Sequence, residues 1–177
     1  MLFRSEDAAQ ILSREALAKD LETINLVLER GAVFLAVCAG FQILGNTFYA
    51  DGKEQKGLGL LDVDSIPGKK RFVGDVKSKY QDLDLQLTGF ENHAGETILS
   101  GDVKPLGKIE VGNGNGDGKF DGAISGNIFG TYLHGPILAR NPEFADLLLN
   151  RAIGHKYTTF NDPVATKYAN WRRKVTK

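Results

Sequence analysis

The sequence VFLAVCAGFQILG, residues 33–45, joins an apolar run to a glycine-containing turn. Residues 33–37 are all apolar, which is typical of a central strand buried on both faces of a parallel sheet. Cys38 follows at the carboxyl end of that strand, and the residues after Gly40 predict a short helix that ends at Gly45. These residues therefore predict a strand, a sharp turn and a helix, with the thiol at the turn.

The residues on the amino side of this unit, 5–30, predict a helix. Leucine and isoleucine recur there three or four positions apart, which places them on one helix face. That apolar stripe consists of Leu17, Leu21, Ile24 and Leu28. Ser13 could cap a second segment, and Gly31 suits the left-handed residue that ends a helix.

From residue 49 to about residue 130 the pattern changes to short strands separated by turn signals. Asp51-Gly52 predicts a hairpin turn, and Pro67-Gly68 predicts a further turn. The strands expected in this β-rich middle are 72–77, 108–111, 123–124 and 128–132.

Two helices are expected near the carboxyl end, because Asn141 and Asp162 are capping residues that each precede a proline. The second helix carries Tyr168 and Trp171. It ends in a basic cluster of Arg172, Arg173, Lys174 and Lys177. A solvated helix face is a commoner role for such a cluster than a binding patch.

Composition narrows the class of protein. The chain has 177 residues, 42% of them hydrophobic, and we expect one domain over residues 1–177. No stretch approaches the roughly 20 consecutive apolar residues of a membrane span. Basic and acidic residues both number 22, so the zero net charge argues against a nucleic-acid or anionic-lipid partner. One cysteine and no cleavable leader pattern favour a cytoplasmic location.

Cys38 is the strongest candidate for a reacting group. A strand that ends in a tight turn can present a side chain above the carboxyl edge of the sheet, as nucleophiles require. The backbone N–H of Ala39 and the following helix N-terminus would favour the thiolate, and the same N–H could stabilise an oxyanion. The alternative is that Cys38 is a small buried hydrophobe, and the strand pattern leaves both interpretations open.

A thiol nucleophile needs a base, and the chain has three histidines. His134 follows an apolar strand and precedes a Gly-Pro turn, so it is expected at the same sheet edge as Cys38. His93 lies in a polar segment interpreted as a turn, which could serve binding or structure. His155 follows the helix-ending Gly154 and is expected to face solvent.

A glycine-rich segment at residues 113–121 resembles a calcium loop, because oxygen-bearing side chains alternate along it. The match is incomplete. Position one is the neutral Asn113, and Ile124 stands where a bidentate glutamate is required. A flexible hairpin tip is therefore the favoured interpretation.

Several motifs together resemble a known enzyme family. VCAGFQILG at 37–45 and GTYLHGP at 130–136 resemble the nucleophile and histidine motifs of class I glutamine amidotransferases. The segments GLGLLD at 57–62, RFVGD at 71–75, GFENHAG at 89–95 and GPILARNP at 135–142 resemble the cobyric acid synthase-like branch, and within it the GatD-type glutaminase subunits of lipid II isoglutaminyl synthase. This resemblance covers about residues 20–153. It implies an α/β, flavodoxin-like fold, with an open, mainly parallel sheet flanked by helices and a β-rich middle.

The resemblance also implies an activity and its residues. L-glutamine would be hydrolysed to glutamate and ammonia, with Cys38 attacking the carboxamide and His134 carrying the proton to the departing ammonia. Ala39 would supply an oxyanion N–H, and Arg71 would bind the glutamine carboxylate. Gln42 would support the pocket.

The partner implied by the resemblance is a MurT-like Mur ligase subunit. It would form a heterodimer with this chain, consume ATP and use the ammonia to amidate the stem glutamate of lipid II in peptidoglycan synthesis. No cofactor or metal is expected in this chain. The Pro-x-Glu that follows the histidine in ordinary class I members is absent after His134, so a third catalytic residue is expected from the partner.

Members of that family place several βα units, and a loop donating a second oxyanion N–H, before the helix at which this chain begins. We therefore expect that the first βα units are missing and that the chain alone has little glutaminase activity. Three alternatives stay open: an amidotransferase of the cobyric acid synthase type, a non-catalytic interaction domain, and a cysteine hydrolase acting on another acyl group.

Overall fold

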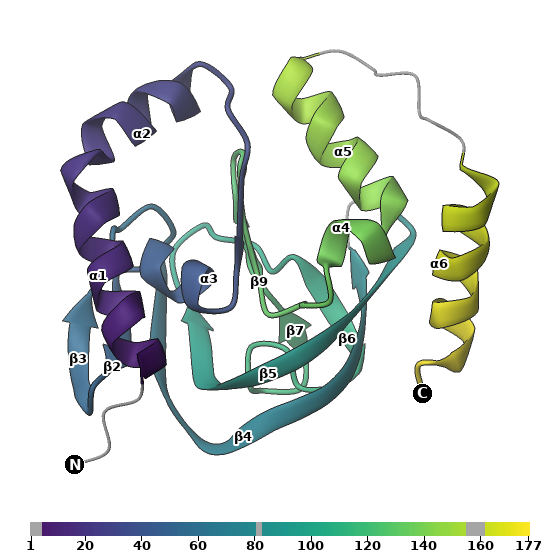
Figure 1. Ribbon diagram of the computed structural model, residues 1–177, viewed down its shortest axis with the longest axis horizontal. Coiled ribbons are helices and arrows are strands. Elements are labelled where there is room, and N and C mark those ends of the chain that lie inside the picture. Colours follow the sequence, from purple (N-terminus) through teal and green to yellow (C-terminus); the bar gives the residue numbers. More distant parts are fainter. Residues whose placement is uncertain (1–4, 81–82, 155–161) are drawn as a thin grey trace.

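The computed structural model describes residues 5–80, 83–154 and 162–177. Its helices are α1 (Ser5–Lys19), α2 (Leu21–Glu29), α3 (Ala39–Leu44), α4 (Ile137–Arg140), α5 (Pro142–Ile153) and α6 (Pro163–Val175). Its strands are β1 (Phe34–Val37), β2 (Thr47–Ala50), β3 (Lys53–Lys56), β4 (Val63–Tyr80), β5 (Leu85–Leu99), β6 (Gly107–Val111), β7 (Phe120–Asp121), β8 (Ala123–Ser125) and β9 (Ile128–Thr131). Figure 1 shows α1 and α2 on one side of the strands and α4, α5 and α6 on the other.

A small sheet of order β1-β9-β8 holds the predicted strand-turn-helix unit. β1 and β9 run parallel, with Phe34 opposite Ile128 and Val37 opposite Thr131. Parallel pairing brings their carboxyl ends to the same edge of the sheet. The residues that follow the two strands, at positions 38 and 132–134, therefore start from neighbouring points.

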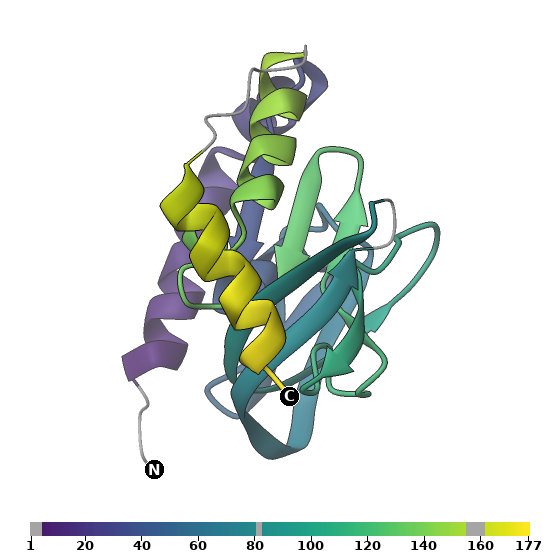
Figure 2. The same ribbon diagram turned by 90° about the vertical axis from the view of Figure 1, so that its right-hand side faces the viewer.

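A larger sheet, of order β3-β2-β4-β6-β7 with β5 against β4, contains the middle of the chain. β4 and β5 form a long antiparallel pair, whose register shifts between Pro67 and Phe72. Figure 2 shows how strongly this pair bends. The expected α/β class is confirmed, but the sheets are mixed rather than mainly parallel, because the middle segment folds into long antiparallel hairpins.

Two local predictions at the amino side need correction. The first helical stretch breaks at Asp20, between α1 and α2, and not at Ser13. β1 is half-buried along its whole length rather than buried on both faces. The reason is its position, because β9 is its sole strand neighbour among the residues that the structure describes.

The turn predictions have opposite outcomes. Asp51 and Gly52 connect β2 to β3 with φ values of 53° and 69°, as a two-residue hairpin turn requires. Pro67 and Gly68, in contrast, lie inside β4 and form no turn. The shift of register beside them accommodates a proline, which has no N–H to donate to the ladder.

The two expected helix caps also differ. Asp162 caps α6, because its Oδ1 accepts hydrogen bonds from the N–H groups of Val164 and Ala165 at 2.8 and 3.2 Å. The Asn141 side chain is fully buried and does not cap α5. It instead bonds both the N–H and the C=O of Thr88, at 2.8 and 2.9 Å, and so attaches the α4–α5 corner to β5.

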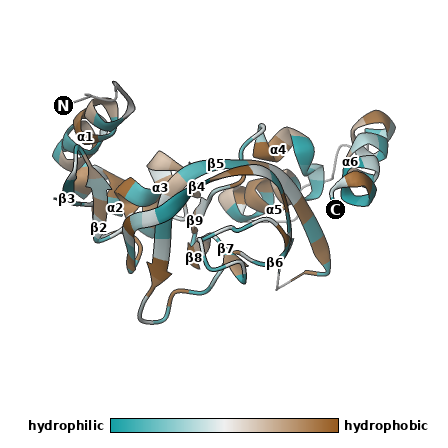
Figure 3. Cartoon of the chain, turned by 90° about the horizontal axis from the view of Figure 1, so that it is seen from below, coloured by the Kyte–Doolittle hydropathy of each residue, from teal (hydrophilic) through white to brown (hydrophobic). Residues whose placement is uncertain are grey.

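The core consists of two clusters that meet at β9. Phe41 and Tyr132 lie in one, and Phe129, Leu133 and Phe144 lie in the other. Figure 3 shows apolar residues gathered where α3 and α5 meet the strands. At Gly130 a Cβ would overlap the ring of Phe41, so glycine is what allows α3 to approach β9 this closely. No helix in the described part of the chain is long and apolar enough to cross a membrane.

Candidate active site

Cys38 occupies the junction between β1 and α3 in a strained conformation. Its φ of 54° and ψ of −112° lie where L side chains are rare. Its N–H donates to the carbonyl of Thr131 at 2.8 Å, and its own carbonyl accepts from the N–H of Gln42 at 3.1 Å. Strain of this kind is typical of a turn that presents a nucleophile.

His134 follows β9 and is held by backbone pairing with Phe90. The N–H of His134 donates to the Phe90 carbonyl at 2.8 Å, and the Phe90 N–H donates back at 3.1 Å. The Nε2 atom of His134 is shielded from solvent and has no hydrogen-bond partner among the described residues. Burial, assisted by the charge of His93, lowers the pKa of His134 below 6.5. The imidazole is therefore neutral at neutral pH and able to accept a proton.

Cys38 and His134 line the same cleft, whose volume is about 540 Å³. Ala39, Gln42 and Arg71 line it too, so all five residues predicted for the site come together there. The catalytic roles predicted for these residues stay predictions, because their position in the cleft does not show which chemical step each one performs. His155 lies outside the described residues.

Arg71 and Gln42 enter the cleft with different degrees of constraint. Arg71 is exposed on β4, and its Nε donates to Asn92 Oδ1 at 2.7 Å. Gln42 is clamped from two sides, since its Oε1 accepts from Gln10 at 2.9 Å and its Nε2 donates to the Tyr132 hydroxyl at 3.0 Å. The arginine can therefore reorient toward a ligand, whereas the glutamine forms a fixed wall.

Beneath that wall is a chain of buried polar groups. The Tyr132 hydroxyl lies 2.7 Å from Thr97 Oγ1, which lies 3.1 Å from Ser65 Oγ. Burial raises the pKa of Tyr132 to about 12, so the phenol stays protonated. Its proton is therefore available to hydrogen-bond in this network throughout the physiological pH range.

The prediction of a turn at His93 is wrong. The residue lies within β5, is buried, and stacks on Tyr132 with ring centroids 3.7 Å apart. Its Nδ1 lies 2.8 Å from the Gly95 carbonyl, which requires Nδ1 to be the donor. Its Nε2 faces Glu91 Oε2 at 3.8 Å. The polar residues around His93 occupy alternating positions of β5, and His93 itself lies on the buried face of the strand.

Glu91 has a role that the sequence did not indicate. Its carboxylate accepts hydrogen bonds from the Asn113 N–H, the Asn113 side chain and the Gly114 N–H, at 2.6–3.1 Å. Burial alone would raise its pKa, but His93 and these donors outweigh burial and lower it. Asp117 Oδ1 meanwhile accepts from the N–H groups of Lys119 and Phe120. The glycine-rich segment is thus the connection of the β6–β7 hairpin, held by Glu91 at its base.

Asp121 is a second buried carboxylate that the sequence did not indicate. It has no exposed surface, and it accepts hydrogen bonds from Thr131 Oγ1 at 2.6 Å and from the Tyr132 N–H at 3.1 Å. Thr131 is the residue whose carbonyl receives the Cys38 N–H. Asp121 therefore braces the short segment that joins the Cys38 turn to His134.

Replacing Asp121 by asparagine should change how stability depends on pH. Burial raises the pKa of Asp121 from 3.8 to about 6. Because the folded-state pKa is raised, protonated Asp121 contributes stability that is fully present below about pH 4 and is lost as the pH rises to about 6. Asparagine does not titrate. The free energy of unfolding of the wild type, relative to that of Asp121→Asn, should therefore decrease by on the order of 3 kcal/mol between pH 4 and 7.

Denaturant unfolding at several pH values measures this difference. Asp102→Asn is the matched control, because Asp102 is exposed on a turn. Parallel pH profiles for wild type and Asp121→Asn would contradict the prediction.

Comparison with known families agrees with this geometry. The model of the CobB/CobQ-like glutamine amidotransferase domain matches residues 4–142. The chain belongs to this family. The family predicted from the motifs at Cys38 and His134 is thereby confirmed.

Individual relatives within and around the family carry more detailed names. The lipid II isoglutaminyl synthase (glutamine-hydrolyzing) subunit GatD of Streptococcus pneumoniae is 41% identical over 155 residues, which cover 86% of this chain and 60% of the relative. The GatD subunit of Staphylococcus aureus is 38% identical, covering 87% of this chain and 63% of the relative. The chain thus spans about three fifths of the length of these relatives.

A solved structure shows the same fold. A chain of the PurLQS structure from Thermotoga maritima superposes with a TM-score of 0.53 at 18% identity, covering 77% of this chain and 66% of that one. At that identity the likeness concerns the fold alone. This likeness agrees with the α/β fold predicted from the sequence.

Proposed function

We propose that this chain is the glutamine-hydrolysing subunit of a lipid II isoglutaminyl synthase. The observation that carries the proposal is the shared cleft, in which a thiol on a strained turn and a neutral imidazole of lowered pKa lie together with an arginine. The identity to two GatD subunits supports the choice of substrate and of assembly.

The reaction follows from the chemistry of these groups. His134 accepts the proton of the Cys38 thiol while the sulfur attacks the carboxamide carbon of glutamine, and the Ala39 N–H stabilises the oxyanion. The C–N bond then breaks, and His134 returns the proton to the leaving ammonia. Water, deprotonated by the same imidazole, cleaves the thioester and releases glutamate.

The ammonia would pass to a MurT-like ligase subunit, which would bind ATP and amidate the lipid II stem glutamate. In this scheme the chain itself needs neither cofactor nor metal. A third catalytic residue that orients His134 would come from that subunit. A second candidate function is amidation of a cobyrinic-acid-type substrate, because cobyric acid synthase of Limosilactobacillus reuteri is 36% identical over 129 residues.

Covalent trapping tests the proposal directly. A diazo-ketone analogue of glutamine should alkylate Cys38, the chain's only cysteine, and glutamine should protect it. Mass spectrometry of the intact chain then shows a single adduct. A chain that takes up no label has lost catalysis and serves as an interaction domain, whereas labelling without protection by glutamine indicates a different acyl substrate.

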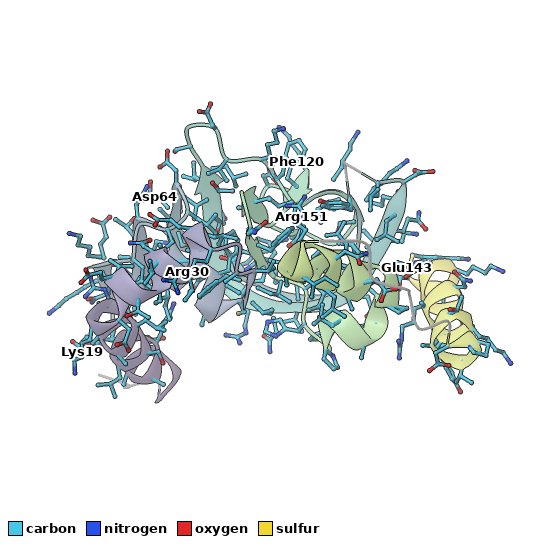
Figure 4. The ribbon with its side chains drawn as sticks, turned by 90° about the horizontal axis from the view of Figure 1, so that it is seen from above. Lys19, Arg30, Asp64, Phe120, Glu143 and Arg151 are labelled. Carbon is cyan, nitrogen blue, oxygen red and sulfur yellow. The ribbon has the colours of Figure 1, made fainter. Side chains whose placement is uncertain are left out.

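Arg71→Lys should weaken the binding of glutamine, and of the glutamine analogue that labels Cys38, without changing the reaction of the thiol itself. Lysine keeps the charge but loses the planar pair of donors that matches a carboxylate. The glutamine concentration that half-protects Cys38 should therefore rise about tenfold, as expected for one lost charge-assisted hydrogen bond. Arg30→Lys, the same change at the residue that directly follows α2 (Figure 4), is the control. Unchanged protection in Arg71→Lys would remove the arginine from the glutamine site.

A further inference from the structure

The helix α6 is attached to the rest of the chain by one face. Arg173 donates to both carboxylate oxygens of Glu143 at 3.0 and 2.7 Å and to the carbonyl of Gln86 at 2.9 Å. Figure 4 shows Glu143 between α5 and α6. Ala169, which is fully buried, points the same way. The orientation of α6 about its own axis is therefore determined, and the opposite face has to look outward.

That outward face carries an apolar stripe. Val164, Tyr168, Trp171 and Val175 follow one another at intervals of four, three and four residues, and their side chains are 59%, 56%, 56% and 49% exposed. Figure 2 shows α6 in front of the other elements, with nothing covering it, and Figure 1 places it at the edge of the molecule. These four residues form what we call the α6 stripe.

Positive charge flanks the stripe on both sides. At 100° per residue, Lys167 and Lys174 fall along one border and Arg172 along the other. The helix contains no acidic residue. The two carboxylates next to it are occupied, since Asp162 caps the helix and Glu143 pairs with Arg173. Viewed from outside, α6 is thus apolar along its middle and cationic along its borders.

We propose that the α6 stripe lies on an anionic lipid bilayer. Valine, tyrosine and tryptophan side chains would enter the boundary between headgroups and acyl chains, where aromatic residues with a polar tip are enriched. Lys167, Lys174 and Arg172 would reach lipid phosphates on either side. This inference goes beyond the proposed hydrolysis of glutamine and does not depend on it.

Two features favour lipid over a protein partner. Four side chains that are already about half-buried expose less area than the roughly 800 Å² per partner of a standard protein interface. The charges bordering the stripe are of one sign, which matches a uniform layer of phosphates. The zero net charge of the whole chain conceals this arrangement, because the five basic residues of positions 163–177 have no acidic counterpart there.

Trp171 makes the test specific, because it is the chain's only tryptophan. The full chain is mixed with vesicles of equal parts phosphatidylglycerol and phosphatidylcholine, or of phosphatidylcholine alone. We expect a blue shift of tryptophan emission and co-sedimentation with the anionic vesicles, and weaker binding as salt increases. Absence of both signals with anionic vesicles overturns the proposal.

Variants that reverse charge and variants that remove apolar side chains separate the electrostatic and hydrophobic contributions to vesicle binding. Lys167→Glu with Lys174→Glu should lower anionic-vesicle affinity at least about tenfold. Lys53→Glu with Lys56→Glu, on the exposed strand β3, changes net charge equally and should reduce affinity far less. Val164→Ser with Tyr168→Ser should also weaken binding and keeps Trp171 as the probe. Equal losses in the two double lysine variants, or a Trp171 shift that requires an added protein rather than lipid, would also overturn it.

Discussion

Cys38→Ser should lower diazo-ketone labelling by about a thousandfold or more, and should abolish whatever low glutamine hydrolysis the chain alone performs. The two side chains differ by one atom, so the strained turn and its hydrogen bond to Thr131 should persist. The hydroxyl, however, has a far higher pKa than a thiol, and the helix N-terminus and Ala39 N–H cannot make it ionise. The loss of labelling would therefore identify Cys38 as the nucleophile, because it would not be explained by a change of fold.

Ammonia release and intact mass measure this effect, and thermal unfolding is the control. The serine variant should unfold within a few degrees of the wild type. Hydrolysis that survives in Cys38→Ser would mean that the thiol on the β1–α3 turn is not the nucleophile.

His134→Asn should slow labelling of Cys38 by about 10²- to 10⁴-fold. Asparagine keeps the backbone pairing with Phe90 but offers no basic nitrogen. Because the Nε2 atom of His134 has no hydrogen-bond partner in the described residues, its removal should cost little stability.

The pH profile distinguishes a base from a spacer. An imidazolium cannot accept the thiol proton, so the wild-type labelling rate should rise with pH through the lowered pKa of His134, below 6.5. The rate should then level off near neutral pH. In His134→Asn this inflection should be missing, and a profile that keeps it would assign the proton to another group.

Local sequence signals were sufficient to predict those parts of the fold that depend only on consecutive residues. The apolar run before Cys38 and the Asp51-Gly52 turn each depend on the backbone preferences of a few neighbouring residues. Cys38 and His134 each follow an apolar strand, and the expectation that both strands end at one sheet edge placed the two residues together, as their shared cleft shows.

Long-range partners could not be read from such signals. β4 and β5 pair over most of their length, so Pro67 and His93 adopt strand conformations that their neighbours do not suggest. Glu91 and Asp121 look like ordinary surface acids in the sequence. These carboxylates can be buried because Asn113 and Thr131 donate hydrogen bonds to them, and only the folded chain brings those donors close.

The parallel pairing of β1 with β9 has a consequence for synthesis. β1 emerges from the ribosome well before β9, because the whole antiparallel middle separates them in the chain. Until that later strand arrives, Cys38 lacks the carbonyl that holds its amide and the imidazole beside it. In a nascent chain, therefore, Cys38 can neither be held in this turn nor share a cleft with His134 until β9 and the residues that follow it have left the ribosome.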